Sequence, residues 1–327
     1  MKRRAFITLL GSAAAAWPLA ARAQQAAMPV IGFLNPTSPD VIADRVRGFR
    51  QGLKESGYVD GENVAIEYRW ADEQFDRLSA LAADLVRRQA NVIVATGGVA
   101  SALAAKAATT TVPIVFQTGG DPVQSGLVAS LSRPGANVTG VTILVTELAT
   151  KQLGLLHELL PGAKRFAVLI NPTSPNAEPL IMEARTAAAA LGLPVDILTA
   201  SDIEGIDAAF ASLAQSRPDA LMVTGNTLFG NRRVQIVTLA THQRLPTIHL
   251  SRAGAQEGGL MSYGPLQNDS AHQLGLYTSR ILKGAKAGDL PVIQEAKFEF
   301  VINLKAAKAL GISVPPTLLA RADEVIE

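Results

Sequence analysis

The stretches VIGFLNPTSP (residues 30–39) and FAVLINPTSP (residues 166–175) each join a short apolar run to the same polar turn. An apolar run of this length followed by Asn-Pro predicts a buried strand of a parallel sheet that ends in a loop. A second pair of turns, Thr96-Gly97-Gly98 and Thr224-Gly225-Asn226, follows the third predicted strand of each half. Two matches in the same order predict two matched α/β units.

The pattern around both stretches alternates between strands and helices. In the first half, the apolar positions Ile42, Val46, Phe49 and Leu53 recur with the period of a helix. Further strands are predicted in both halves at 64–70, 92–95, 113–116, 195–198, 220–223 and 247–250. Such alternation is typical of a parallel sheet with crossover helices, so the expected fold class is α/β with two doubly wound units.

The charge of the chain is concentrated at its beginning. The 327 residues include 30 basic and 28 acidic ones, and four of the basic residues fall within residues 1–23. The remaining 26 basic and 28 acidic residues give a net charge of −2, which argues against a nucleic-acid partner.

Residues 1–23 have the features of a cleaved secretory signal. Basic residues precede an apolar run, and Ala21-Arg22-Ala23 forms an A-x-A cleavage site, so cleavage is expected after Ala23. The alternative, a membrane anchor, needs a longer apolar run than the one that Pro18 interrupts. Arg3-Arg4 followed by Phe6-Ile7 resembles a twin-arginine export signal, although the ordinary secretory route stays open. With no cysteine available for lipid attachment, a free periplasmic protein is expected.

Ligands of open parallel sheets bind outside the carboxyl ends of the strands, where the matched loops lie. The glycines let backbone amides approach a ligand closely. Asp121 reads equally well as a helix cap or as a ligand contact, and His249 stands at a strand end near the expected cleft. The predicted ligand-binding residues are Ser38, Thr96, Gly97, Gly98, Thr118, Asp121, Asn171, Ser174, Asn226 and His249.

The sequence offers no catalytic constellation. The four histidines lack metal-ligand spacing, and no G-x-S-x-G elbow, H-E-x-x-H motif or phosphate-binding loop is present. The turn after the first strand, Asn35-Pro36-Thr37, also lacks the dinucleotide fingerprint. We therefore expect neither enzymatic activity, nor a metal, nor a cofactor.

Several motifs together resemble the ABC transporter substrate-binding family, which includes tryptophan- and other aromatic amino-acid-binding proteins. The resemblance covers nearly all of the chain after the leader, and its clearest motifs are VIGFL (30–34), GFRQGL (48–53), EYRWA (67–71), GGDPV (119–123) and GGLMSYG (258–264). It implies a type I periplasmic-binding fold, in which two Rossmann-like domains are joined by a hinge of three crossing strands. We place the crossings near Gly140, Gly264 and Val292.

These crossings divide the chain into a first domain of residues 28–140 plus 265–292 and a second of 141–264 plus 293–327. The resemblance further implies that a monomer closes its hinge over a small solute, such as an amino acid or an aromatic carboxylate. An inner-membrane permease with its ATPase would then receive the solute. The alternative is a periplasmic sensor that presents the bound solute to a membrane receptor.

One segment departs from the family pattern. Many relatives carry an aromatic and acidic cluster where residues 251–256 here read SRAGAQ. A partner for a ligand ammonium is therefore missing at this place, and Arg252 would favour an acid that lacks an amine.

Overall fold

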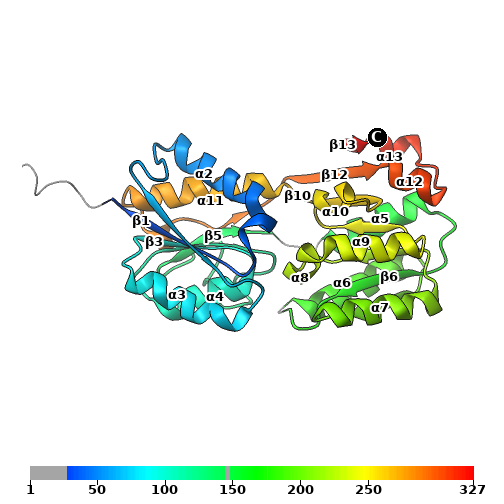
Figure 1. Cartoon of the computed structure of the whole chain (residues 1–327), viewed down its shortest axis with the longest axis horizontal. Coiled ribbons are helices and arrows are strands. Elements are labelled where there is room, and N and C mark those ends of the chain that lie inside the picture. Colours follow the sequence, from blue (N-terminus) through cyan, green and yellow to red (C-terminus); the bar gives the residue numbers. More distant parts are fainter. Residues whose placement is uncertain (1–27, 144–147, 175) are drawn as a thin grey trace, which may run out of the picture.

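The structure is a computed structural model that describes residues 28–143, 148–174 and 176–327 (Figure 1). The predicted leader, residues 1–23, lies outside the described residues. Two lobes lie side by side along the long axis of the molecule, each built around its own sheet. Within the described part of the chain, no helix combines the length and the hydrophobicity needed to cross a membrane.

The first lobe contains a six-stranded parallel sheet of order β11-β5-β4-β3-β1-β2. Its strands are β1 (Val30–Asn35), β2 (Ala65–Trp70), β3 (Val92–Ala95), β4 (Ile114–Thr118), β5 (Val138–Thr142) and β11 (Ile293–Gln294). Its helices are α2 (Ala43–Glu55), α3 (Leu78–Arg87), α4 (Val99–Ala108) and α11 (Gln267–Leu282), with short 3-10 turns η1 (Pro39–Ile42), η2 (Phe75–Arg77) and η4 (Ala287–Asp289). The first-lobe sheet has a hydrophobic core on each face, and successive residues of β1 point into opposite cores. Phe33 packs with α2 and α11, and Leu34 packs with α3 and α4.

The second lobe contains a seven-stranded sheet of order β13-β12-β10-β9-β8-β6-β7, in which only the β10–β12 pairing is antiparallel. Its strands are β6 (Phe166–Ile170), β7 (Val195–Thr199), β8 (Ala220–Val223), β9 (Thr247–His249), β10 (Met261–Pro265), β12 (Phe298–Asn303) and β13 (Glu324–Ile326). Its helices are α5 (Leu148–Leu159), α6 (Ala177–Ala190), α7 (Ile203–Ser216), α8 (Thr227–Asn231), α9 (Arg233–His242), α10 (Arg252–Gln256), α12 (Leu304–Leu310) and α13 (Pro316–Leu319). The predicted fold class, two doubly wound α/β units, is confirmed.

The chain passes between the two sheets after β5, after β10 and after β11. Because β11 pairs with β5, the third passage begins after Gln294, slightly beyond the position near Val292 that the sequence suggested. The carboxylate of Glu295 lies buried at this passage and accepts hydrogen bonds from Ser270 Oγ (2.9 Å) and the backbone N–H of Lys297 (3.0 Å). The crossing segment is therefore tied to the first turn of α11.

Helices α2 and α11 pack unusually closely because glycines line their contact. A methyl group on Gly52 would clash with the carbonyl oxygen of His272, and one on Gly275 would clash with the carbonyl oxygen of Phe49. Both glycines lie within helices, where glycine normally costs stability. Here the absence of a side chain lets α11, which follows the second crossing, sit directly on the first lobe.

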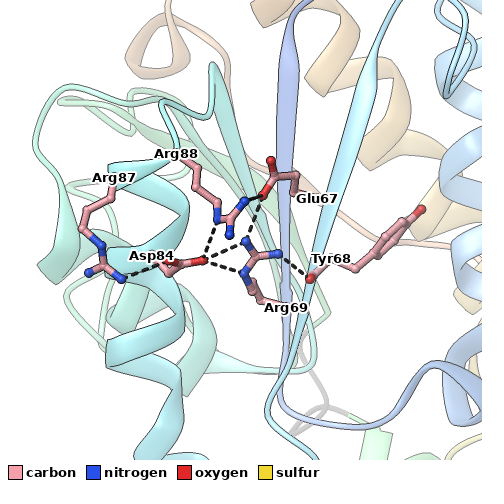
Figure 2. A network of polar contacts seen from close by, with 6 residues as sticks. All are labelled: Glu67, Tyr68, Arg69, Asp84, Arg87 and Arg88. Carbon is pink, nitrogen blue, oxygen red and sulfur yellow. Dashed lines mark hydrogen bonds and ion pairs between the residues drawn. The ribbon is translucent and has the colours of Figure 1, made fainter.

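An ion-pair network fastens the edge strand β2 to α3 (Figure 2). Arg69 pairs with Asp84 at 2.7 Å and with Glu67 at 2.8 Å, while Arg87 and Arg88 reach Asp84 at 3.0 and 3.1 Å. The hydrogen bond from Arg69 holds the pKa of Asp84 below its ordinary value. Every charge in this network is already paired, so we interpret the network as structural and not as a ligand-binding site.

We predict that Gly52→Ala lowers the free energy of unfolding by about 1–3 kcal/mol, because the added methyl pushes α2 away from α11. The matched control is Gly154→Ala in α5, where nothing lies within 4 Å of the added carbon. That substitution should stabilise the protein by about 0.5–1 kcal/mol through helix propensity. Urea unfolding measures both, and equal effects of the two substitutions would contradict the close packing.

Candidate ligand-binding site

The repeated Asn-Pro-Thr turn has the same geometry in both lobes. After β1, Asn35 Oδ1 accepts hydrogen bonds from the backbone N–H and the hydroxyl of Thr37, both at 2.8 Å. After β6, Asn171 Oδ1 accepts the equivalent bonds from Thr173 at 2.9 and 2.8 Å. Each asparagine thus closes a local turn and leaves its side-chain NH2 group free to reach a neighbouring loop.

These NH2 groups connect the loop after the first strand of each lobe to the loop after its third strand. Asn35 Nδ2 donates to Thr96 Oγ1 at 2.7 Å, and Asn171 Nδ2 donates to Asn226 Oδ1 at 3.3 Å. Asn226 Nδ2 in turn donates to Ser174 Oγ at 2.7 Å. The structure therefore brings together three of the predicted second-lobe residues, and it places Thr96 beside the turn of the first lobe.

The loop after β3 requires glycine. Gly97 has φ 84°, and a side chain there would clash with the ring of Pro36. Gly98 has φ 123° and precedes the first residue of α4. The two loops of the first lobe consequently lie against each other.

Loops of the two lobes also meet directly. Thr227 Oγ1 donates to the carbonyl of Gly97 at 3.1 Å, and Asn176 Nδ2 donates to the carbonyl of Gly119 at 3.3 Å. Glu73 accepts a further hydrogen bond from Asn231 Nδ2 at 2.9 Å. The carboxyl-end loops of the two sheets therefore face each other and are in direct contact.

The remaining predicted residues of the first lobe have different environments. Thr118 is buried at the end of β4, and its hydroxyl has no hydrogen-bond partner among the described residues. Ser38 is partly exposed at the start of η1 and makes no side-chain cap. Asp121 accepts hydrogen bonds from the backbone N–H groups of Val123 (2.7 Å) and Gln124 (3.2 Å). Within the described residues, no helix follows Asp121 before β5, so its carboxylate caps a turn and not the helix that the sequence suggested.

His249 is the last residue of β9, at the strand end where the sequence places it, but its side chain is buried. Its ring packs against Gly254 and Gly259 so closely that neither could carry a side chain, and it shares a 3.0 Å hydrogen bond with Thr247. Burial lowers the pKa of His249 to about 4, so the ring is neutral at pH 7. This environment is a core position beside α10, and we therefore withdraw His249 from the expected ligand contacts.

Arg252 does not provide a free cation. Its guanidinium pairs with Glu299 of β12 at 3.1 Å and with Glu324 of the edge strand β13. Two nitrogens of the Arg252 guanidinium are thus already paired with carboxylates, which gives no support to the expectation that this residue favours an acidic ligand.

A small cavity in the first lobe reveals two residues that the sequence pattern did not single out. The cavity has room for about one water molecule (≈ 10 Å³) and includes Asn35, Arg45, Thr96 and Gln117 in its lining. Neither the guanidinium of Arg45 nor the amide of Gln117 makes a hydrogen bond to a described side chain, and Arg45 has no ion pair there. Arg45 stands four residues before Phe49, on the apolar stripe of α2. A charged residue at such a position is the sequence feature that could have identified it as a candidate site residue.

The described residues contain no group of three or more His, Asp or Glu side chains that could hold a metal ion. The facing loops and the first-lobe cavity instead offer hydroxyls, amides, backbone groups and the guanidinium of Arg45. Such a set can bind and orient a polar solute through hydrogen bonds.

Comparison with known proteins identifies the family. A family model described as ABC transporter substrate binding protein matches residues 30–326. A protein from Clostridioides difficile named tyrosine-binding protein is 28% identical over 266 residues, which cover 81% of this chain and 76% of the relative.

Two solved structures differ in how well they superimpose. An ABC domain in complex with L-Trp from Streptococcus pneumonia matches with a TM-score of 0.84, at 27% identity over 91% of this chain and 99% of that one. The ligand-free, open structure of a substrate binding protein with adhesive properties from Clostridium difficile matches with a TM-score of 0.68, at 25% identity and the same coverage. At nearly equal identity, the present structure is closer to the tryptophan complex.

We predict that His249 makes the protein less stable in acid. Its folded pKa of about 4 lies below the ordinary 6.5, so the unfolded chain binds a proton first as the pH falls. The stabilisation present above pH 6.5 should be lost progressively towards pH 4, by up to about 3 kcal/mol. In His249→Gln, unfolding measured from pH 7 to pH 4 should depend less steeply on pH.

The control for this experiment is His242→Gln at the exposed end of α9. If both variants kept the pH dependence of the unsubstituted protein, the assignment of His249 as a buried neutral ring would be refuted.

Proposed function

We propose, because this chain belongs to the ABC transporter substrate binding protein family, that it captures a small organic solute in the cleft between its lobes. The solute would be an amino acid or an aromatic or other carboxylate compound. The protein would act in the periplasm after export and deliver the solute to an inner-membrane permease with its ATPase. It binds and releases the solute without converting it.

The observation that carries this proposal is the pairing of two polar loop sets across a hinge. Thr96 and Gly97 belong to one set, and Asn226 and Thr227 belong to the other. Both sets stand at the carboxyl ends of their sheets, where open α/β sheets bind ligands. Within the first set, the hydroxyl of Thr118 is buried and unpartnered among the described residues, which is costly unless a ligand or water uses it.

Hinge closure supplies the mechanism. We propose that the two lobes move as domains about the three crossings, with β5 up to Thr142 and β11 up to Gln294 belonging to the first lobe. A ligand favours the closed form only if it binds that form more tightly than the open one, and contact with both domains provides that difference. The closer match to the tryptophan complex than to the open, ligand-free relative supports the assignment of this structure as the closed form.

The two sides of the cleft have separate tasks in this proposal. Ser38, the segment Thr96–Gly98 and Thr118 bind the polar head of the solute. Asn171, Ser174 and Asn226 close over its other end. The tyrosine- and tryptophan-binding relatives make aromatic and amino-acid solutes the first compounds to test.

A thermal-shift screen tests the function as a whole. Protein stripped of solute by unfolding and refolding is exposed to aromatic amino acids, aromatic carboxylates, branched-chain amino acids and small amides. A ligand present at 100 times its Kd stabilises by about 2.7 kcal/mol, a shift of several degrees. If no compound raises the melting temperature, solute capture is contradicted.

Thr96→Ala and Thr118→Ala should each weaken binding of the solute by about 5- to 15-fold, the loss expected for one hydrogen bond. The fold should be retained, as judged by circular dichroism. Thr186→Ala is the matched control, because its hydroxyl lies on the exposed face of α6 and, among the described residues, bonds only to the carbonyl of Met182. Unchanged affinity in both cleft variants, measured by titration calorimetry, would refute the head-group site.

A further inference from the structure

Arg45 is a cation without a counterion, and it lies beside the candidate site residues Asn35 and Thr96. It projects from the first turn of α2 into the cavity that Asn35, Thr96 and Gln117 also line. The other arginines of the same helix are paired: Arg47 with Asp44, and Arg50 with Asp60 at 2.9 Å. Arg45 has no hydrogen bond and no ion pair with any residue that the structure describes.

The surroundings of Arg45 oppose its charge. Burial, and secondly the charge of Arg233, lower its pKa to about 10, with Asp44 acting weakly in the other direction. Arg233 belongs to α9 in the second lobe, so two like charges approach each other where the lobes meet. Arg233 has its own carboxylate, Glu257 at 3.2 Å, whereas Arg45 has none.

Phe33, Phe49 and Leu274 line the same cavity, and no acidic side chain is among its described lining residues. Arg45 is half-buried, so its unpaired guanidinium is less well solvated than one on the open surface, and a negatively charged group beside it would be favourable. Its planar donors match a carboxylate, which accepts two parallel hydrogen bonds.

We propose that the solute is an organic acid and that Arg45 binds its carboxylate, with Gln117 and Thr96 as neighbouring hydrogen-bonding groups. The proposal rests on the solute-binding function and specifies its substrate class. The carboxylate also offsets the repulsion between Arg45 and Arg233, so an anionic solute favours the closed lobes more than its neutral analogue does.

Titration calorimetry on the purified protein tests the charge requirement. The probes are 3-phenylpropanoate, benzoate and 4-methylpentanoate, each compared with its primary amide, which has nearly the same shape and no charge. At least one carboxylate should bind, and its amide should bind at least 10-fold more weakly. Equal binding of acid and amide, or binding of no carboxylate, would overturn the proposal.

The side chain is tested with Arg45→Gln and the matched control Arg47→Gln, which removes an exposed charge two positions along the same helix. Arg45→Gln should weaken binding of the carboxylate by about 10- to 100-fold, the loss of a charge-assisted hydrogen bond. Arg45→Lys should lose less, and Arg47→Gln should bind as the unsubstituted protein does. Full affinity in Arg45→Gln would overturn the role of Arg45.

The stability of the ligand-free protein separates binding from a structural role. Because the charge of Arg45 is unpaired, Arg45→Gln should raise the melting temperature without ligand while it lowers affinity. A lower melting temperature would indicate that Arg45 supports the fold and would count against the proposal.

Mass spectrometry of co-purified solute separates this inference from the function on which it rests. An organic acid would support both. An uncharged solute would overturn the carboxylate assignment and leave solute capture in place. Failure of every added or co-purified compound to raise the melting temperature would count against both.

Discussion

The parallel order of the strands places the loops that follow them at one edge of each sheet. In the first lobe, β1, β3 and β4 end at Asn35, Ala95 and Thr118, so their polar loops converge on one small volume. The second lobe repeats the arrangement, and the three crossings turn the two edges towards each other. Loop contacts such as Thr227 to Gly97 then follow from topology, because these backbone groups have no strand partners to satisfy them.

The glycine contact between α2 and α11 has a second consequence for the cleft. α11 follows the second crossing, and Ala271 and Leu274 on this helix line the cavity beside Arg45. The close approach at Gly52 and Gly275 therefore holds one cavity wall against the other. It also connects the cavity to the hinge, since Ser270 on α11 bonds to Glu295 at the third crossing. A hinge segment and a candidate binding wall thus share one helix.

The repeated turn and the loop glycines could be predicted from sequence because their physical requirements are local. Asn-Pro-Thr forms its own turn, and only glycine tolerates the backbone of Gly97. The surroundings of the His249 and Arg252 side chains could not be predicted from sequence, because they depend on residues that lie elsewhere in the chain. Glycines 254 and 259 enclose His249, and carboxylates from β12 and β13 occupy Arg252. Arg45 was visible as a charge in an apolar stripe, but only the tertiary structure shows that it lacks a partner.

Small-angle X-ray scattering of the ligand-free and the solute-loaded protein tests the central claim, closure of two lobes over a solute, most directly. The account predicts that the ligand-free protein is more extended than the structure described here and that a saturating solute reduces its radius of gyration to the value of this closed form. A radius of gyration that stays the same with and without a bound solute would contradict closure of the lobes as the mechanism of capture.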